Sequence, residues 1–222
     1  MIHMTLSTPS HHFKRLLQVD KIRHPRDFVG LSPAFWQAHA GRVCLEIGAG
    51  KGKHALQFAA AYPDAVLIAI ERTQEKFTAM AKLAAQVDLP NLQVIHADAI
   101  AWSVFALPPN SLSKVFILYP NPEPHNPNQR WLNMPFFEFL LSRVQTGGQI
   151  LLASNVASYI DEAQDQAVNV WQLPTTRHVI ATDSQRTHFE IKYLARGQTC
   201  WQLEMVKPHG YVTRLDGVNF SV

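Results

Sequence analysis

The chain has 222 residues, of which 47% are hydrophobic and 17% are charged, and its formal net charge is +3. This length and hydrophobic content suit one α/β domain with a substantial core. No apolar run approaches the roughly 20 residues that a membrane span needs, and the start lacks the apolar region of a signal peptide. The composition therefore argues against a membrane protein, and we expect a soluble, cytoplasmic one.

Cysteine and histidine usage argues against a metal site. Cys44 and Cys200 lie far apart in strand-like runs, which favours buried reduced thiols over a disulfide or a metal pair. The eleven histidines are scattered without ligand spacing. The small positive charge, with a pI of about 8.9, tolerates an anionic partner without requiring one.

The first segment of the chain, residues 1–30, is polar and basic. It could follow the phosphates of a nucleic acid, or it could be an ill-ordered terminus, and both alternatives stay open. A short helix is expected over residues 33–40.

From residue 43 onward, apolar runs alternate with helical patterns. We expect strands over residues 43–47, 66–71, 92–97, 114–119, 148–154 and 199–206, with another over either 176–180 or 188–193. We expect helices over residues 52–62, 73–87, 99–105, 128–145 and 156–171. The pattern predicts an α/β fold with a doubly wound, mostly parallel sheet of about seven strands. The last strand follows a turn at Gly197 with no room for a crossover helix, which predicts a terminal antiparallel hairpin.

A glycine-rich turn follows the first expected strand, in the sequence Glu46-Ile-Gly48-Ala-Gly50-Lys-Gly52-Lys53-His54. Glycines let the backbone turn sharply and approach a ligand closely. A dinucleotide-binding turn has its third glycine one position later, where Lys53 stands, and a P-loop has serine or threonine where His54 stands. The spacing therefore argues against both of these phosphate-binding turns.

Acidic residues stand at the ends of the first three expected strands, where ligands of open α/β sheets gather. Glu46 and Glu71 fall in the first two strands, and Asp98 follows the third. One carboxylate can accept hydrogen bonds from both ribose hydroxyls, and another can face an ammonium group. S-adenosylmethionine has both groups and no pyrophosphate, so we expect it as the cofactor. Asp98 would contact the adenine amine, or it could only cap the next helix.

A proline-rich loop, Tyr119-Pro-Asn121-Pro-Glu-Pro, follows the fourth expected strand. Alternating prolines hold such a loop extended, because each fixes its own φ and restricts the residue before it. The loop could fix Asn121 over the methyl group of the cofactor, or it could merely end the strand.

Eight motifs of the chain occur in a characteristic order. They are Glu46-x-Gly48-x-Gly50-x-Gly52, Glu71, Asn91-Leu92 before Asp98-Ala99, Tyr119-Pro-Asn121-Pro, Pro135-Phe136, Gly147-Gly148, Ala153-Ser154-Asn155 and Thr187-His-Phe-Glu190. Over about residues 43–207 this series resembles the bacterial tRNA (guanine-N7) methyltransferases. Its most specific parts are the Pro-Asn-Pro loop and the element from Thr187 to Glu190.

The resemblance implies a class I, Rossmann-like methyltransferase that uses S-adenosylmethionine and modifies N7 of a guanosine in the variable loop of tRNA. It implies a catalytic domain over residues 41–207, after an N-terminal arm and short helix over 1–40 and before a tail over 208–222. The cofactor would be held by Glu46, Gly48, Gly50, Gly52, Glu71 and Asp98. The methyl-transfer site would be lined by Asn121, Asn155, Thr187 and Glu190.

The chain departs from this family pattern around the acceptor side. The family has aspartate where Asn121 and Asn155 stand, and a tryptophan with lysines and arginines after the loop, where residues 123–131 carry little basic charge. An amide offers a guanine fewer acceptor sites than a carboxylate does. Two alternatives therefore stay open: a related methyltransferase with a small-molecule or protein substrate, and a non-catalytic cofactor-binding protein.

If guanine is the acceptor, its N7 carries a lone pair and no proton, so no general base is needed and catalysis is mostly alignment. We expect Asn121 and Glu190 to orient the base and Thr187 to assist through its hydroxyl. We expect Asn155 to support these residues without touching the base itself. Phosphate contacts could come from Arg130, Arg186 and Lys192, although each could equally be ordinary surface charge.

Overall fold

The computed structural model describes residues 15–220. The first 14 residues of the expected basic arm lie outside this range. Within residues 15–220, no helix is long and apolar enough to cross a membrane. The same residues contain no group of three side chains that could hold a metal ion. Cys44 and Cys200 are both buried free thiols.

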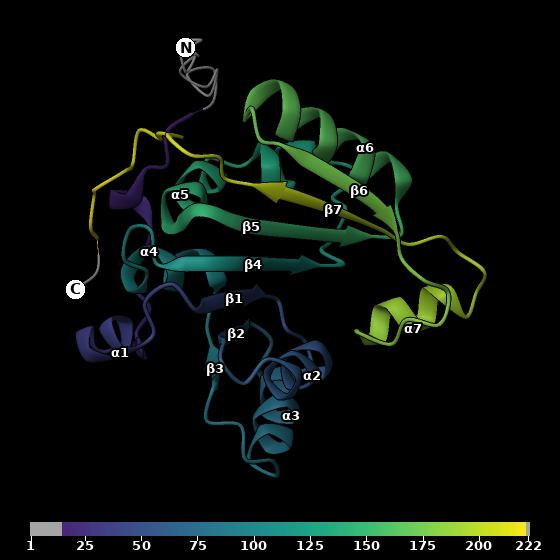
Figure 1. The fold of residues 1–222 in the computed structure, drawn as a ribbon, viewed down its shortest axis with the longest axis horizontal. Helices are drawn as coiled ribbons and strands as arrows, with labels where there is room; N and C mark the ends of the chain where they lie inside the picture. The colour runs from purple at the N-terminus through teal and green to yellow at the C-terminus, as the bar shows by residue number, and fades with distance from the viewer. Residues whose placement is uncertain (1–14, 221–222) are drawn as a thin grey trace, which may run out of the picture.

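A seven-stranded sheet forms the centre of the fold, with the order β3-β2-β1-β4-β5-β7-β6 (Figure 1). The strands are β1 Val43–Ile47, β2 Val66–Glu71, β3 Leu92–His96, β4 Leu112–Leu118, β5 Val144–Ser154, β6 Thr175–Val179 and β7 Trp201–Val206. The first five pair in parallel, and β7 runs antiparallel to both of its neighbours. The predicted doubly wound, mostly parallel sheet is therefore confirmed.

Helices cover both faces of the sheet. They are α1 Pro33–Ala38, α2 Lys53–Ala61, α3 Gln74–Ala84, α4 Ala99–Ala106, α5 Phe136–Arg143, α6 Ala157–Asp165 and α7 His188–Leu194. A π-helical turn over Gln166–Val170 continues α6. One buried cluster joins the sheet to α4, α5 and α6, and a second joins it to α2 and α3.

Alternation along β1 decides which side chain faces which layer. Val43, Leu45 and Ile47 belong to the cluster that contains α4 to α6. Cys44 belongs to the cluster on the α2 side, and Glu46, two residues later, points to that same side. The side chain of Glu46, at the end of β1, therefore points toward the layer that contains the glycine turn and α2.

Two sequence predictions fail for identifiable reasons. The helix expected over 128–145 is two short 3₁₀ turns, then α5, then the start of β5, because Pro135 disfavours helical backbone at Met134, which is extended. The strand alternative over 188–193 is wrong, because this segment is α7. The antiparallel arrangement of the last strands is confirmed, but α7 stands between β6 and β7, so they do not form a tight hairpin.

The chain ends within the described range pack on the domain. Nε1 of Trp102 donates a 2.8 Å hydrogen bond to the carbonyl of Val29, which ties the N-terminal segment to α4. At the other end, Nη2 of Arg143 donates a 2.6 Å bond to the carbonyl of Val218. Arg214 forms an ion pair with Glu138 of α5. The segment after residue 207 therefore covers α5 and helps to bury it.

Candidate active site

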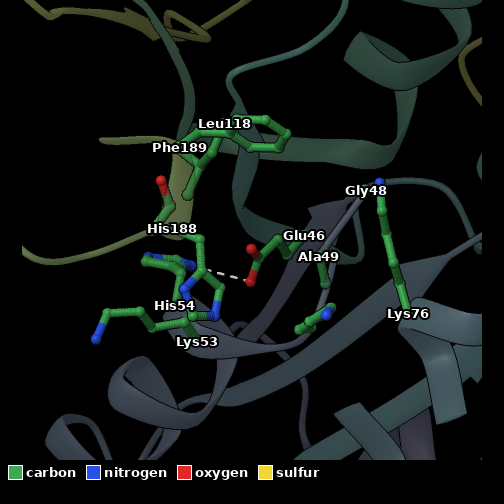
Figure 2. A pocket seen from close by; sticks show the side chains of 12 residues that line it. Glu46, Gly48, Ala49, Lys53, His54, Lys76, Leu118, His188 and Phe189 are labelled. Atoms are coloured by element: carbon green, nitrogen blue, oxygen red, sulfur yellow. Dashed lines mark hydrogen bonds and ion pairs between the residues drawn. The ribbon is translucent and has the colours of Figure 1, made fainter. Parts of the chain in front are cut away.

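A cavity of about 310 Å³ lies at the carboxyl ends of β1 and β4 (Figure 2). Figure 1 places α7 beyond the arrowheads of these strands, where it closes one side. The lining residues are Glu46, Gly48, Ala49, Gly50, Lys51, Lys53, His54, Lys76, Leu118, Thr187, His188 and Phe189. The cavity therefore brings together the glycine turn and the Thr187 element, which are far apart in sequence.

The three glycines of the turn have two different tasks. All have positive φ: 75° at Gly48, 61° at Gly50 and 82° at Gly52. A Cβ at Gly48 or Gly50 would meet no heavy atom within 4 Å, whereas one at Gly52 would lie 2.6 Å from Cγ of Met80. The first two glycines thus leave backbone open beside the cavity, and the third lets α2 pack against α3.

Glu46 lies inside the cavity as predicted from its position, but it is paired. Oε2 of Glu46 lies 2.9 Å from Nδ1 of His54, and both side chains are buried. The imidazole ring packs against Phe116, with 4.7 Å between ring centroids. Figure 2 shows the acid and the imidazole facing each other.

Glu71 and Asp98 lie outside the cavity lining and support the surrounding backbone. Oε2 of Glu71 accepts a 2.9 Å hydrogen bond from the amide of Gly50, and Oε1 accepts a 2.7 Å bond from the amide of Thr73. Oδ1 of Asp98 accepts bonds of 3.0 Å from two amides in the first turn of α4. The capping role considered for Asp98 is therefore confirmed, and Glu71 holds the glycine turn in place.

Glu190 is fully buried in a closed network. Its carboxylate accepts hydrogen bonds from the Tyr119 hydroxyl, from the Ser184 hydroxyl and from the guanidinium of Arg186. Burial alone would raise the pKa of Glu190, but the hydrogen bonds from Arg186 and Ser184, with the charge of Arg186, hold this pKa below its ordinary value. Because a carboxylate has about four acceptor sites, little capacity remains for a substrate in this arrangement.

Thr187 lines the cavity and begins α7. Its hydroxyl accepts a 2.9 Å hydrogen bond from the amide of Glu190, three residues later. This is the first half of a capping box, a pattern that marks the start of a helix. The Thr-x-x-Glu spacing was thus a sequence signal for α7.

Asn121 and Asn155 lie outside the cavity lining, and each donates to a neighbouring side chain. Nδ2 of Asn121 donates a 2.8 Å bond to Oε1 of Glu123, and Nδ2 of Asn155 donates a 3.0 Å bond to Oε1 of Gln198. The loop that carries Asn121 therefore also carries a carboxylate, two residues further along the chain.

Two of the three candidate phosphate contacts are engaged inside the protein. Nε of Arg130 donates a 2.8 Å bond to the carbonyl of Pro122, and its guanidinium forms an ion pair with Glu162 of α6. Arg186 is bound to Glu190. Arg130 therefore fixes the proline loop to α6.

Five basic residues line the cavity that were not among the predicted site residues. Lys51, Lys53, Lys76, His54 and His188 come from the glycine turn, α2, α3 and α7. The run Lys51-Gly-Lys53-His54 places three of them close together in the sequence, and this basic run is the signal that could have identified them. Lys76 and His188 carried no local signal, because only the fold brings them to this cavity.

Known proteins identify the family. Residues 40–203 match the model of a family described as "Putative methyltransferase". A tRNA (guanine-N(7)-)-methyltransferase from Anaeromyxobacter dehalogenans is 30% identical over 184 residues, which cover 78% of this chain and 90% of that protein. The protein of the same name from Idiomarina loihiensis is 28% identical over 169 residues, which cover 73% and 69% of the two chains.

Solved structures agree on the fold. The 16S rRNA methyltransferase KamB has a TM-score of 0.60 and 18% identity, and the match covers 83% of this chain and 98% of that one. A 16S rRNA (adenine(1408)-N(1))-methyltransferase from Catenulisporales acidiphilia also has a TM-score of 0.60, with 15% identity, and the match covers 82% and 94%. These likenesses support the class I methyltransferase architecture alone. The match to the family model and the relative that is 30% identical show that the chain belongs to the tRNA (guanine-N(7)-)-methyltransferase family.

Proposed function

We propose that the protein transfers a methyl group from S-adenosylmethionine to N7 of a guanosine in tRNA. The observation that carries the proposal is the cavity at the strand ends, where Glu46 and the open backbone of the glycine turn face Thr187 on α7. The names of the sequence relatives support tRNA as the acceptor. The proposed catalytic unit is the segment 41–207, and the reaction would take place in the cytoplasm.

The residues at the cavity suit the proposed cofactor. Among residues 15–220, Glu46 is the only acid in the lining, and its buried carboxylate matches the ammonium end of S-adenosylmethionine. Cβ atoms at Gly48 and Gly50 would stand in open space beside the cavity, so the absence of side chains there leaves room for a ligand. Glu71 would contribute to ribose binding through its hold on Gly50, and Asp98 would lie near the adenine end.

The protein's part in the reaction is alignment. When bound, the cofactor supplies an electrophilic methyl group. Guanine N7 needs no deprotonation, so the residues have only to position the base. We assign this task to the Asn121–Glu123 pair on the proline loop and to Thr187 at the cavity. Glu190 would act by holding α7 and Tyr119 in place, and Asn155 would support the same edge through Gln198.

Acceptor phosphates would meet the basic side chains around the cavity. Lys51, Lys53 and Lys76 supply positive charge there, whereas Arg130 and Arg186 are bound internally. Electrostatic contacts to phosphates provide much of the affinity of proteins for nucleic acid.

The test is a methyl-transfer assay with purified protein, labelled S-adenosylmethionine and unmodified tRNA transcripts, followed by mass spectrometry of the nucleosides. The expected product is 7-methylguanosine. Cofactor binding without methylation of any tRNA would overturn the acceptor assignment and favour the small-molecule or protein alternative. Absence of cofactor binding would overturn the methyltransferase assignment itself.

A further inference from the structure

Phe189 is an exposed aromatic residue in the wall of the cavity. In the described part of the chain, Phe189 and Tyr62 are the two aromatic residues that stand clearly exposed, at 44% and 57%. Phe189 belongs to the cavity lining, and Tyr62 does not. Figure 2 shows Phe189 and Leu118 on one side of the cavity, with His54 and Lys53 on the other. An incompletely covered ring therefore lines a space that can receive a ligand.

Phe189 is also the outer member of a row of three aromatic rings. Its ring is stacked with that of Tyr193, one helical turn later on α7, with 6.1 Å between centroids and 18° between planes. The ring of Tyr193 lies 5.8 Å from that of Tyr119, which is buried directly after β4. The row thus leads from the interior of the protein to the cavity, and a further flat ring can extend it only at Phe189.

The residues on either side of Phe189 are held in place. The amide of Glu190 donates a 2.9 Å hydrogen bond to the Thr187 hydroxyl, which fixes the first turn of α7. The carboxylate of Glu190 is bound by Tyr119 and Arg186. A side chain on such a fixed backbone loses little freedom when a ligand packs on it, which favours binding.

The position of Phe189 suits the acceptor rather than the methyl donor. Glu46, which is assigned to the donor, is only 2% exposed, whereas Phe189 is 44% exposed. The ring therefore lies on the side of the cavity that a macromolecule can reach. Lys51 and Lys53 belong to the same lining, so they can supply positive charge for the phosphates of that macromolecule.

We propose that Phe189 binds the acceptor purine by stacking against it at the opening of the cavity. Proteins commonly recognise the unstacked bases of RNA by stacking them on aromatic side chains. Enzymes that modify a base often take it out of its own stack first. The inference rests on the proposed function, and it assigns the purine a binding residue that Asn121, Glu123 and Thr187 do not replace, because those residues offer hydrogen bonds and no ring.

The test compares Phe189→Leu and Phe189→Tyr with the parent as full chains. Leucine keeps an apolar side chain and removes the flat ring, whereas tyrosine keeps the ring. Stacking of one base contributes enough affinity that we expect kcat/KM for unmodified tRNA, at saturating S-adenosylmethionine, to fall at least about fivefold in Phe189→Leu. Phe189→Tyr should stay within about twofold of the parent. Calorimetry should give both variants a dissociation constant for S-adenosylmethionine within about twofold of the parent value, which also checks that they are folded.

Tyr62→Leu provides the matched control. Tyr62 is exposed and packs on Phe58, one turn earlier on α2, as Phe189 packs on Tyr193, but it lies outside the cavity lining. Its replacement should leave both kcat/KM for tRNA and cofactor affinity near the parent values. An equal loss in Tyr62→Leu and Phe189→Leu would overturn the proposal, because the loss would then not depend on the cavity.

The remaining outcomes separate this proposal from the proposed function. Unchanged kcat/KM for tRNA in Phe189→Leu would overturn the stacking role and leave the methyltransferase assignment intact. So would an equal loss in Phe189→Tyr, since the ring would then not be what matters. Weaker binding of S-adenosylmethionine by Phe189→Leu would place the ring against the donor and overturn the assignment to the acceptor. Failure of the parent itself to methylate tRNA would instead overturn the proposed function.

Discussion

The hydroxyl of Tyr119 donates a 2.8 Å hydrogen bond to Oε2 of Glu190, and this bond joins the end of β4 to α7. Tyr119 has a positive φ of 53°, which is costly for a residue with a large side chain. The surrounding contacts hold it there, since its amide also donates a 2.8 Å bond to the carbonyl of Ala153. Glu190 therefore connects the residue that follows β4 to the helix whose first residues line the cavity.

Replacing Glu190 with glutamine should destabilise the protein. The change removes the negative charge that pairs with Arg186, and loss of one partner of a buried pair is costly. Because the Arg186 side chain is 30% exposed, we expect a decrease of about 2 kcal/mol in the free energy of unfolding rather than the full cost of a buried pair. Urea denaturation would measure it, and Tyr119→Phe should cost only about 1 kcal/mol. Equal stability of Glu190→Gln and the parent would contradict a stabilising role of the Glu190 network.

The same network predicts a pH dependence. The pKa of Glu190 is lowered in the folded protein, so its contribution to stability is fully present above the pKa of the unfolded carboxyl, about 4.5. The contribution is lost as the pH falls through the lower, folded pKa. Acid unfolding of the parent, followed by circular dichroism, should therefore become steep below about pH 4.5. The difference in stability between the parent and Glu190→Gln should shrink there, and a constant difference would argue against the lowered pKa.

The glycine turn offers a matched pair of substitutions. Gly48→Ala places a methyl group in open space at the cavity, so it should weaken cofactor binding strongly at a stability cost of only about 1–2 kcal/mol for the positive φ. Gly52→Ala has the same backbone cost and adds a contact at 2.6 Å with Met80. It should lower the melting temperature more. Calorimetric titration would measure cofactor binding by both variants, and thermal unfolding would measure their melting temperatures. A larger loss of melting temperature in Gly48→Ala than in Gly52→Ala would contradict the assignment of Gly48 to the cavity and of Gly52 to helix packing.

The apolar runs made the sheet predictable, because continuous buried strands have few alternatives once glycines and prolines mark their ends. Helix α7 was harder to predict, because polar and apolar residues alternate along its seven residues as they do in a strand. Only the capping residue Thr187 indicates that the segment is a helix. The helix expected over 128–145 failed where Pro135 interrupts it, a local signal that outweighs the apolar pattern.

At the candidate site, the position of Glu46 followed from its place at the end of β1. Its partner His54 lies only eight residues away, but the pairing depends on how α2 turns back over the sheet. The closed network of Glu190 could not be predicted, because Tyr119 and Glu190 are separated by 71 residues and meet only through the fold. The sequence thus placed Glu46 and Thr187 among the candidate site residues, and the structure shows that both line the cavity, whereas Asn121 and Asn155 lie outside its lining.

Arg130→Ala should act through the proline loop rather than through tRNA phosphates. The substitution removes the bond to the Pro122 carbonyl and the ion pair with Glu162, so we expect a stability loss of about 2 kcal/mol. Methyl transfer should fall, while the dissociation constant of S-adenosylmethionine should remain that of the parent. The salt dependence of tRNA binding should also be unchanged, and a shallower slope would instead identify Arg130 as a phosphate contact.

Lys76 and Lys82 provide a direct test of where tRNA phosphates lie, because both belong to α3 and only Lys76 lines the cavity. Each phosphate contact contributes about −0.9 to the slope of log affinity against log salt for duplex nucleic acid. Lys76→Ala should therefore reduce the steepness of this slope by roughly one unit and weaken binding at low salt. Lys82→Ala should leave both quantities near the parent values, because its exposed side chain lies outside the cavity lining. Filter binding of unmodified tRNA at several salt concentrations would measure both variants, and equal slopes would place the acceptor phosphates away from this cavity.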